Sequence, residues 1–360
     1  MSAPRYLLVH GDPAGAARHP LAALPAGVAA ALATATGASV AVLPAATGPS
    51  PGAPDLLRAA AAHGEAVLEQ ARGHDVVLSL DVPAAAAALA ARRLGGPPVL
   101  ARMALAGLRL DAAAQASVTA LARGADALLA PSAAHRELLR PLAGAPPVEA
   151  LLEALAAHEL AAADGGPRPV DPAVPPRLLV LGGAPWSRAV LGGLLRCLVE
   201  EPGLTVSVAG PADDAPAKAL RTGAERLGVG GRVTWAGDVS GPDLLRELDA
   251  ATVVLDPGNS TDATLVPLAA MARARAVVAP GRHAAADVVV SGVTGTLFRA
   301  EDERFVARAV LGTWRDGFRC SAFGVAGADR LRSRFAAERV LRAVEECGSA
   351  LAGALDSRTA

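Results

Sequence analysis

A glycine-containing turn in the first tenth of the sequence could hold an anion. The run Tyr6 to Val9 is apolar and strand-like, and His10-Gly11-Asp12-Pro13-Ala14-Gly15 follows it. Around Gly11 and Gly15 the backbone N–H groups can approach a phosphate, as they do in glycine-rich loops between a strand and a helix. The alternative interpretation is a plain strand-to-helix turn, because the G-x-G-x-x-G spacing of dinucleotide-binding loops is absent.

Basic side chains that could bind a phosphate follow two strand-like runs in the second half. Gly182 and Arg188 come after one run, and Arg282 and His283 come after another. A guanidinium can hold a phosphate through two parallel hydrogen bonds, and a helix that begins near Arg188 adds the partial positive charge of its N-terminus. These residues predict modest binding of a phosphate-bearing ligand, with solvated loop side chains as the alternative interpretation.

Such loops need a scaffold that brings several strand ends to one edge, and the hydrophobic pattern predicts one. Short runs rich in β-branched residues or leucine alternate with Ala- and Leu-rich helical segments, which is typical of parallel sheets covered by helices. The expected strands are 6–9, 39–43, 75–79, 98–100 and 127–129 in the first half, and 177–181, 204–209, 233–235, 252–255 and 276–279 in the second. The segment from about Ala326 to Ala354 has helical spacing.

Glycines and prolines interrupt this pattern at residues 161–176, which we interpret as a linker. The sequence therefore predicts a Rossmann-like domain over 1–160, a second over 177–335, and a C-terminal helix over 336–360 that returns to the first domain. Ligands of parallel sheets bind at the carboxyl ends of the strands, so two facing sheets would place the site in a cleft between them.

Composition excludes several classes of function. With 52% hydrophobic and 19% charged residues the chain is globular, and a net charge of −1 gives no general attraction to nucleic acid or to an anionic membrane. Cys197, Cys320 and Cys347 lack the spacing of a metal or redox site, so we expect no metal, no cofactor and a reducing, cytoplasmic environment. The sequence begins without the pattern of a signal peptide, and we expect no transmembrane segment.

Several passages of the second half, in order, resemble the large retaining group 1 family of GT-B glycosyltransferases. The passages are Ala224 to Val229 with Arg232 to Gly237 ("AERLGV..RV.F.G"), Leu244 to Leu255 ("LL..AD.VV"), Leu265 to Ala272 ("IVPLEAMA") and Ser291 to Phe298 ("DGVTGLLV"). In the first half, Ala71 to Leu100 and Ala122 to Leu138 are similar to "ARPDVVHAHD...LARRLGVPLV" and "RADAVVATSEAEREEL". The resemblance implies an α/β protein of GT-B architecture, with two Rossmann-like domains facing each other across a cleft.

The same resemblance implies which two cations should hold the donor diphosphate, and one of them is missing. The family's arginine and lysine positions are occupied by Gly183 and Arg188, so one cation remains. The family's later glycine pair, which lets the backbone approach the diphosphate, is occupied by His283 and Ala284, and Arg282 with His283 are candidates to compensate.

The carboxylate pair that the family uses for sugar and ribose hydroxyls is also missing. Its two positions carry Thr261 and Ala269, and only Thr261 can make a hydrogen bond. Asp262 and Asp256 lie nearby, so a shifted carboxylate and a loop-capping aspartate are both open interpretations. The family's histidine positions in the first domain carry Leu78, Leu80, Ala101 and Ala104.

We therefore interpret the chain as a glycosyltransferase-like protein with an eroded donor site. It would be non-catalytic or weakly active, binding a nucleotide or nucleotide sugar, or acting as partner of an active paralogue or as a homo-oligomer. The alternative is an active retaining enzyme that moves a hexose from a nucleotide sugar through a rewired site. A third interpretation is a metabolite-binding Rossmann protein without transferase ancestry.

Overall fold

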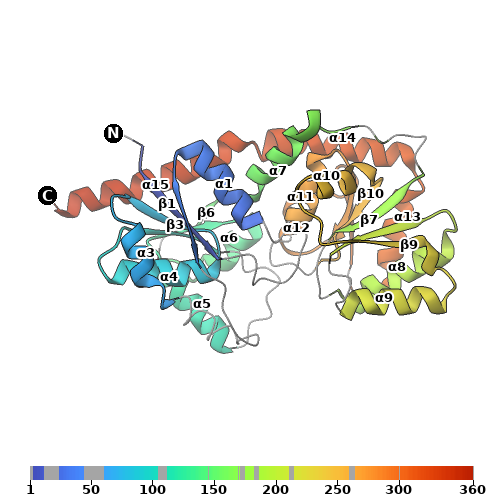
Figure 1. Ribbon diagram of the computed structural model, residues 1–360, viewed down its shortest axis with the longest axis horizontal. Coiled ribbons are helices and arrows are strands. Elements are labelled where there is room, and N and C mark those ends of the chain that lie inside the picture. The colour runs from blue at the N-terminus through green and yellow to red at the C-terminus, as the bar shows by residue number, and fades with distance from the viewer. Residues whose placement is uncertain are drawn as a thin grey trace. The chain divides into compact units, whose positions relative to one another are not determined.

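The computed structural model describes residues 3–11, 24–43, 61–103, 112–144, 146–168, 170, 175–181, 186–210, 215–258, 264–299 and 301–359 (Figure 1). The chain divides into two compact units, which are described separately. The first contains the chain up to Ala156 together with Ala337–Ala360, and the second contains Ala157–Ala336.

The first unit is built on a six-stranded parallel sheet with the order β2-β1-β3-β4-β5-β6. Its strands are β1 (Tyr6–Gly11), β2 (Ser39–Leu43), β3 (Val76–Ser79), β4 (Val99–Arg102), β5 (Ala127–Ala130) and β6 (Val148–Glu149). Every residue of β3 and β4 is buried. Apolar runs buried on both sides are characteristic of central parallel strands with helices on both faces of the sheet.

Helices cover both faces of this sheet. They are α1 (Leu24–Thr36), α3 (Gly64–Gln70), α4 (Val82–Arg93), α5 (Ala112–Gly124), α6 (Ala133–Leu139), α7 (Glu153–Ala162) and α15 (Ala337–Thr359). In Figure 1, α3, α4 and α5 lie on one side of the strands, and α1 and α15 lie on the other. The core between α4 and the sheet is made largely of alanine, which lets this helix pack close to the strands.

The C-terminal helix α15 packs on the sheet of the first unit although almost the whole sequence separates them. The hydroxyl of Tyr6 on β1 donates a hydrogen bond to the carbonyl of Val344 at 3.1 Å, and burial raises the pKa of this phenol. Gly348, one turn further along α15, faces the Tyr6 ring so closely that a β-carbon there would overlap the ring. Glycine therefore sets how near α15 can approach β1.

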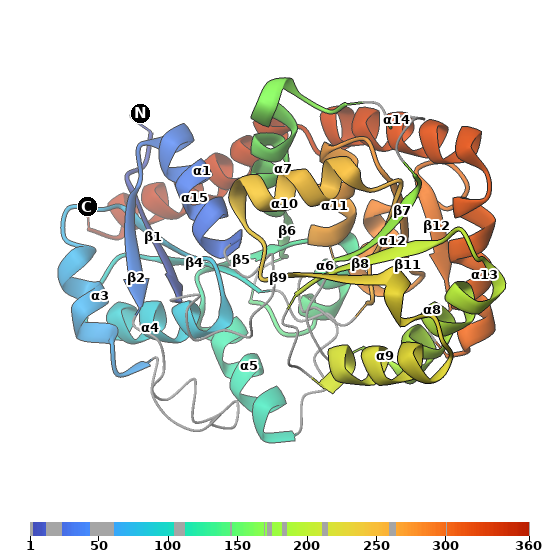
Figure 2. The ribbon, with the colours of Figure 1, turned by 45° about the vertical axis from the view of Figure 1, so that its right-hand side comes forward.

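The second unit repeats the architecture with a six-stranded parallel sheet of order β12-β11-β10-β7-β8-β9 (Figure 2). Its strands are β7 (Arg177–Leu181), β8 (Thr205–Ala209), β9 (Val233–Gly237), β10 (Val253–Leu255), β11 (Ala276–Pro280) and β12 (Gly295–Phe298). The three strands β7, β10 and β11 lie side by side at its centre and are buried almost throughout.

Its helices are α8 (Arg188–Glu200), α9 (Ala215–Arg226), α10 (Gly241–Ala250), α11 (Leu265–Ala272), α12 (His283–Val288), α13 (Glu303–Trp314) and α14 (Gly317–Arg334). Figures 1 and 2 show α8, α9 and α13 on one face, and α10, α11 and α14 on the other. On α8, a β-carbon at Gly193 would lie 2.6 Å from Val306 of α13. These two helices can therefore pack in close contact.

Two buried arginines connect the segment before β7 to the rest of the second unit. Arg273 donates to both carboxylate oxygens of Asp249 at 2.8 and 2.7 Å, and also to the carbonyls of Leu160 and Ala163. Arg275 donates to the carbonyls of Leu248, Asp249 and Arg168. Both side chains are almost completely buried, so these acceptors replace water around two positive charges.

The expected α/β class and the GT-B sheets are confirmed, while several boundaries differ from the sequence-based expectation. β1 continues through His10 and Gly11, which were expected in a turn. The expected helix over 326–354 is two helices, α14 and α15, separated at Phe335 and Ala336. α7 extends to Ala162, so the first residues of the expected linker are helical. Within the described residues, no helix has the length and apolar character needed to cross a bilayer.

We predict that Gly348→Ala lowers the free energy of unfolding by about 1 to 3 kcal/mol, because the new methyl group overlaps the buried Tyr6 ring. Gly312→Ala on α13 is the matched control, since a β-carbon there meets no atom within 4 Å and alanine favours a helix. Urea unfolding of both variants measures the difference. Equal stability of the two would show that α15 does not depend on this contact.

Candidate functional site

The carboxyl ends of three neighbouring strands bring the candidate residues of the second unit to one edge. β10 pairs with β7 on one side and with β11 on the other, both in parallel. Arg188 follows β7, Asp256 follows β10, and Arg282 follows β11. Arg188 and Arg282 are almost one hundred residues apart in the sequence, and strand pairing places the strands that precede them on either side of β10.

Arg188 is the first residue of α8, and its side chain is exposed. The helix is capped by Ser187, whose hydroxyl accepts a hydrogen bond from the Val190 N–H at 3.2 Å. The buried ring of Trp186 fixes the residue before the cap in the core. Among the described residues no carboxylate forms an ion pair with Arg188, so its guanidinium can take an external anion. Gly182, the other candidate of this loop, lies outside the described residues.

Asp256 ends β10 and is buried, with 2% of its surface exposed. Its Oδ1 accepts a hydrogen bond from the Gly258 N–H at 2.8 Å, and its Oδ2 has no hydrogen-bond partner within the described chain. Burial raises the pKa of this carboxyl to about 7, against the opposing effect of the Gly258 N–H. The loop-capping interpretation of Asp256 is correct for one oxygen, and the other oxygen remains available.

Gly258 places this turn against the end of β11. Its φ is +83°, and a β-carbon would lie 2.6 Å from Pro280. Next to Pro280, Gly281 donates to the carbonyl of Phe298 at 2.7 Å, and Arg282 is the exposed N-cap residue of α12. The loop expectation for His283 is wrong, because this residue begins α12.

Of the two positions where the family has carboxylates, the structure describes Ala269 but not Thr261. Thr261 and Asp262 lie outside the described residues, as does Gly15 of the first turn. Ala269 lies in α11 with 2% of its surface exposed, packed on every side by the core. Thr264, at the start of α11, is also buried, and its hydroxyl has no hydrogen-bond partner among the described groups.

The first unit contains a polar cluster at the carboxyl ends of its strands that the sequence analysis missed. Arg102 ends β4, donates to the carbonyl of Leu80 at 2.8 Å, and forms a buried ion pair with Glu153 at the start of α7. The exposed fractions of the two side chains are 7% and 3%. Glu153 Oε2 and the Ser79 hydroxyl have no described hydrogen-bond partner. The signal was available, since a charged residue directly ends the apolar run of β4.

Two further groups lie at the same edge of the first sheet. His10 is buried near the end of β1, where Gly11 is the last residue of the strand. After β5, Ser132 caps α6, and its hydroxyl lies 2.9 Å from Nδ1 of the buried His135. Buried polar residues of this unit therefore gather where parallel sheets commonly bind ligands.

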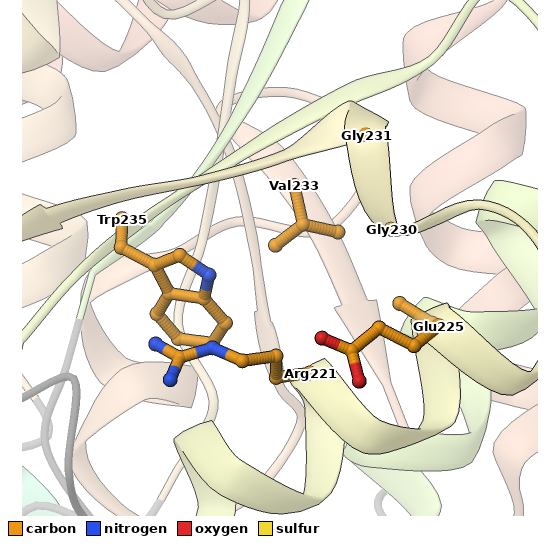
Figure 3. A pocket seen from close by; sticks show the side chains of 7 residues that line it. Arg221, Glu225, Gly230, Gly231, Val233 and Trp235 are labelled. Atoms are coloured by element: carbon orange, nitrogen blue, oxygen red, sulfur yellow. The ribbon is translucent and has the colours of Figure 1, made fainter.

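A cavity of about 550 Å³ lies elsewhere in the second unit, between α9 and the edge strand β9 (Figure 3). The guanidinium of Arg221 stacks on the Trp235 ring at 4.8 Å, and Glu225, one turn further along α9, also lines the cavity. This cavity contains none of the residues expected to bind phosphate. No group of three potential metal ligands occurs in the part of the chain that the structure describes.

The raised pKa of Asp256 predicts a pH dependence of stability. In the unfolded chain this carboxyl loses its proton near pH 4, whereas in the folded protein it does so near pH 7. Between these values the folded state binds more protons, so the free energy of unfolding should fall as the pH rises from about 4 to about 7. Asp256→Asn cannot ionise and should remove this contribution, which gives a gain on the order of a few kcal/mol at pH 8 and little at pH 4.

Thermal unfolding between pH 4 and pH 8 measures this difference. Asp316→Asn, at the exposed N-cap of α14, is the control and should give no gain at pH 8. Parallel profiles for Asp256→Asn and the natural protein would contradict the prediction.

The ion pair between Arg102 and Glu153 predicts an asymmetric mutant series. Glu153→Ala leaves the buried guanidinium without its counter-charge and should cost about 3 to 5 kcal/mol. Replacing both residues, as Arg102→Met with Glu153→Leu, should recover most of this loss. Asp243→Ala, which breaks an exposed pair with Arg246, should cost at most about 1 kcal/mol in the same urea titration. A double variant as unstable as Glu153→Ala would rule out this explanation.

Comparison with known proteins identifies the second unit by sequence. Residues 188–316 match the family described as "Glycosyl transferases group 1". The lipopolysaccharide core biosynthesis mannosyltransferase LpcC of Rhizobium leguminosarum bv. viciae is 30% identical over 134 residues. The matched segment covers 37% of this chain and 38% of that relative.

Solved structures match along the whole chain. Sucrose-phosphate synthase of Thermosynechococcus elongatus superposes with a TM-score of 0.75 at 18% identity, covering 97% of this chain and 100% of that one. HepE of Anabaena, in a complex with UDP and glucose, gives a TM-score of 0.70 at 16% identity, covering 96% and 99%. At such identities the likeness concerns the fold. The two six-stranded parallel sheets and these superpositions show the GT-B fold, and residues 188–316 are similar in sequence to group 1 glycosyl transferases.

Proposed function

We propose that this protein is a glycosyltransferase homologue with an eroded donor site, which binds a phosphate-bearing ligand and is non-catalytic or only weakly active. The phosphate site comprises Arg188 and Arg282, with Gly182 in the sequence between β7 and α8 and His283 as the first residue of α12. Its ligand is a nucleoside diphosphate or a nucleotide sugar. The acceptor, if one is used, belongs to the first unit.

Ala269 is the observation that carries this proposal. It occupies the position where the resemblance to group 1 enzymes implies a carboxylate for the hydroxyls of the donor. A methyl group makes no hydrogen bond, and Ala269 is buried in α11. Loss of one preorganised polar group typically lowers the rate by about 10² to 10³.

Retention of anion binding is supported by the two exposed arginines. Arg188 and Arg282 follow β7 and β11, which flank β10, and no described carboxylate neutralises either guanidinium. HepE of Anabaena has been solved with UDP and with UDP-glucose. UDP is therefore the first probe to test on this chain.

An active enzyme with a rewired site is the second candidate, and Asp256 favours it. This carboxyl is buried at the same edge, one oxygen lacks a described partner, and its pKa of about 7 permits proton exchange near neutral pH. In that case Asp256 would take the place of the lost carboxylates. Action as the partner of an active paralogue, or as a homo-oligomer, is a further proposal that co-purification would test.

Calorimetry with UDP and UDP-glucose tests the proposed function. Without carboxylates that bind the sugar, the two ligands should bind with similar affinity. Arg188→Ala should weaken both about tenfold or more, because a charge-assisted hydrogen-bond pair is lost. Arg226→Ala, an exposed arginine on α9, is the control and should leave binding unchanged.

Assays with UDP- and GDP-sugars complete the test, and no release of nucleotide above background is expected. Strong preference for UDP-glucose over UDP, or unchanged binding in Arg188→Ala, contradicts the eroded site. Robust turnover that Asp256→Asn abolishes would instead establish the rewired enzyme.

A further inference from the structure

Two adjoining cavities follow α13 on the surface of the second unit. One, of about 430 Å³, lies between α13, the edge strand β12 and the start of α14, and the other, of about 370 Å³, lies between α13 and α8. Arg308 and Gly312 of α13 line both, so the two cavities adjoin along this helix, and the pair is here named the α13 groove. Its walls contain six arginines: Arg196, Arg299, Arg304, Arg308, Arg315 and Arg319.

The positive charge of the α13 groove is only partly compensated. Glu200 is the one carboxylate among the lining residues, and it pairs with Arg196 at 2.5 Å. Arg315 pairs with Glu201 at 2.7 Å, and Arg319 is 3.5 Å from Asp316. Arg299, Arg304 and Arg308 have no carboxylate oxygen within 4.0 Å in the described chain. Two of these three guanidinium groups are on α13 and the third follows β12, so the α13 groove has a local excess of positive charge in a protein whose net charge is −1.

An aromatic ring holds two of these cations close together. The guanidinium carbons of Arg299 and Arg308 lie 6.0 and 5.8 Å from the centre of the Phe305 ring, which is 38% exposed. A guanidinium on a ring face is attracted by the π electrons, and its N–H groups remain free to donate. Phe305 thus offsets part of the repulsion between like charges and leaves their donors available.

The lining of the α13 groove differs from that of the cavity between α9 and β9. There, one arginine and one glutamate, Arg221 and Glu225, project from the same helix one turn apart, and Arg221 is stacked on Trp235 (Figure 3). A site with one charge of each sign does not select an anion. In the α13 groove the excess is entirely positive, and both of its cavities share the uncompensated Arg308.

We propose that the α13 groove is a binding site for an anion that carries at least two phosphate groups. Arg308 lies where the two cavities meet and would contact both groups. Arg299 and Arg319 would serve one group, and Arg304 the other. Guanidinium donors match phosphate oxygens in pairs, and two linked phosphates fit two adjoining cationic cavities better than one phosphate does. None of these residues belongs to the proposed donor site.

Calorimetry with inorganic pyrophosphate, at an ionic strength matched with sodium chloride, tests the soluble form of this ligand. Binding is expected in the natural protein and should weaken about tenfold or more in Arg308→Met, which loses charge-assisted donors. The titration is repeated in the Arg188→Ala background, which removes the proposed donor cation, and the Arg308-dependent part of the binding should persist there, so the two sites can be distinguished. Arg226→Met, with the same loss of charge outside the groove, is the matched control.

Sedimentation with vesicles tests phosphate groups presented on a lipid surface. Vesicles of cardiolipin, whose headgroup carries two linked phosphates, with phosphatidylcholine are compared with vesicles of phosphatidylcholine alone. Arg308-dependent pyrophosphate binding supports a soluble ligand, and Arg308-dependent sedimentation with the anionic vesicles alone supports a lipid headgroup. The proposal is overturned if neither probe binds, or if Arg308→Met and Arg226→Met weaken binding equally, because the effect would then be one of net charge.

Discussion

The parallel pairing of β10 between β7 and β11 is the constraint on which the candidate site depends. All three strands are apolar and buried, so none can move without opening the core of the second unit. Because the strands are parallel, their carboxyl ends meet at one edge and their loops follow side by side. Arg188, Asp256 and Arg282 are neighbours in this sense alone, and Gly258 tightens the arrangement by bringing the turn after β10 against Pro280.

Buried charged side chains in this protein connect segments that are not joined by strand pairing. Arg273 and Arg275 bind Asp249 and the carbonyls of the segment before β7, while the buried pair of Arg102 and Glu153 connects β4 to α7. Burying an ion costs several kcal/mol before its partners are counted, so such groups persist only where their hydrogen bonds are nearly complete. Glu153 and Asp256 each retain an oxygen without a described partner, and both lie at the carboxyl end of a sheet.

Arginine therefore has three distinct roles in the second unit. Buried arginines organise backbone carbonyls, the exposed Arg188 and Arg282 follow strands at the carboxyl edge of the second sheet, and two arginines of the α13 groove stack on Phe305. The roles differ in how deeply each guanidinium is buried and in whether protein groups already accept its hydrogen bonds or balance its charge. A guanidinium surrounded by carbonyls is already satisfied, whereas one supported by an aromatic ring keeps its donors for a ligand.

The sequence by itself determined the class of fold and its division into two sheets. Alternating apolar strands and Ala- and Leu-rich helices can bury their surfaces only as helix-covered parallel sheets, and the ordered group 1 passages indicated the family. It also showed that Ala269 cannot act as a carboxylate. The local sequence pattern was less informative about where elements end. His10 and Gly11 belong to β1 because β2 pairs alongside them, and nothing in these two residues indicates that pairing.

Only the tertiary structure decided which polar residues are buried, paired or free. Asp256 has the same sequence context as a capping aspartate, and its raised pKa arises from atoms that surround it in three dimensions. Arg102 and Glu153 are fifty-one positions apart, and the arginines of the α13 groove come from α8, α13, α14 and the residues directly after β12 and α13. Desolvation and charge compensation depend on such distant neighbours, which is why residue type and spacing could not reveal them.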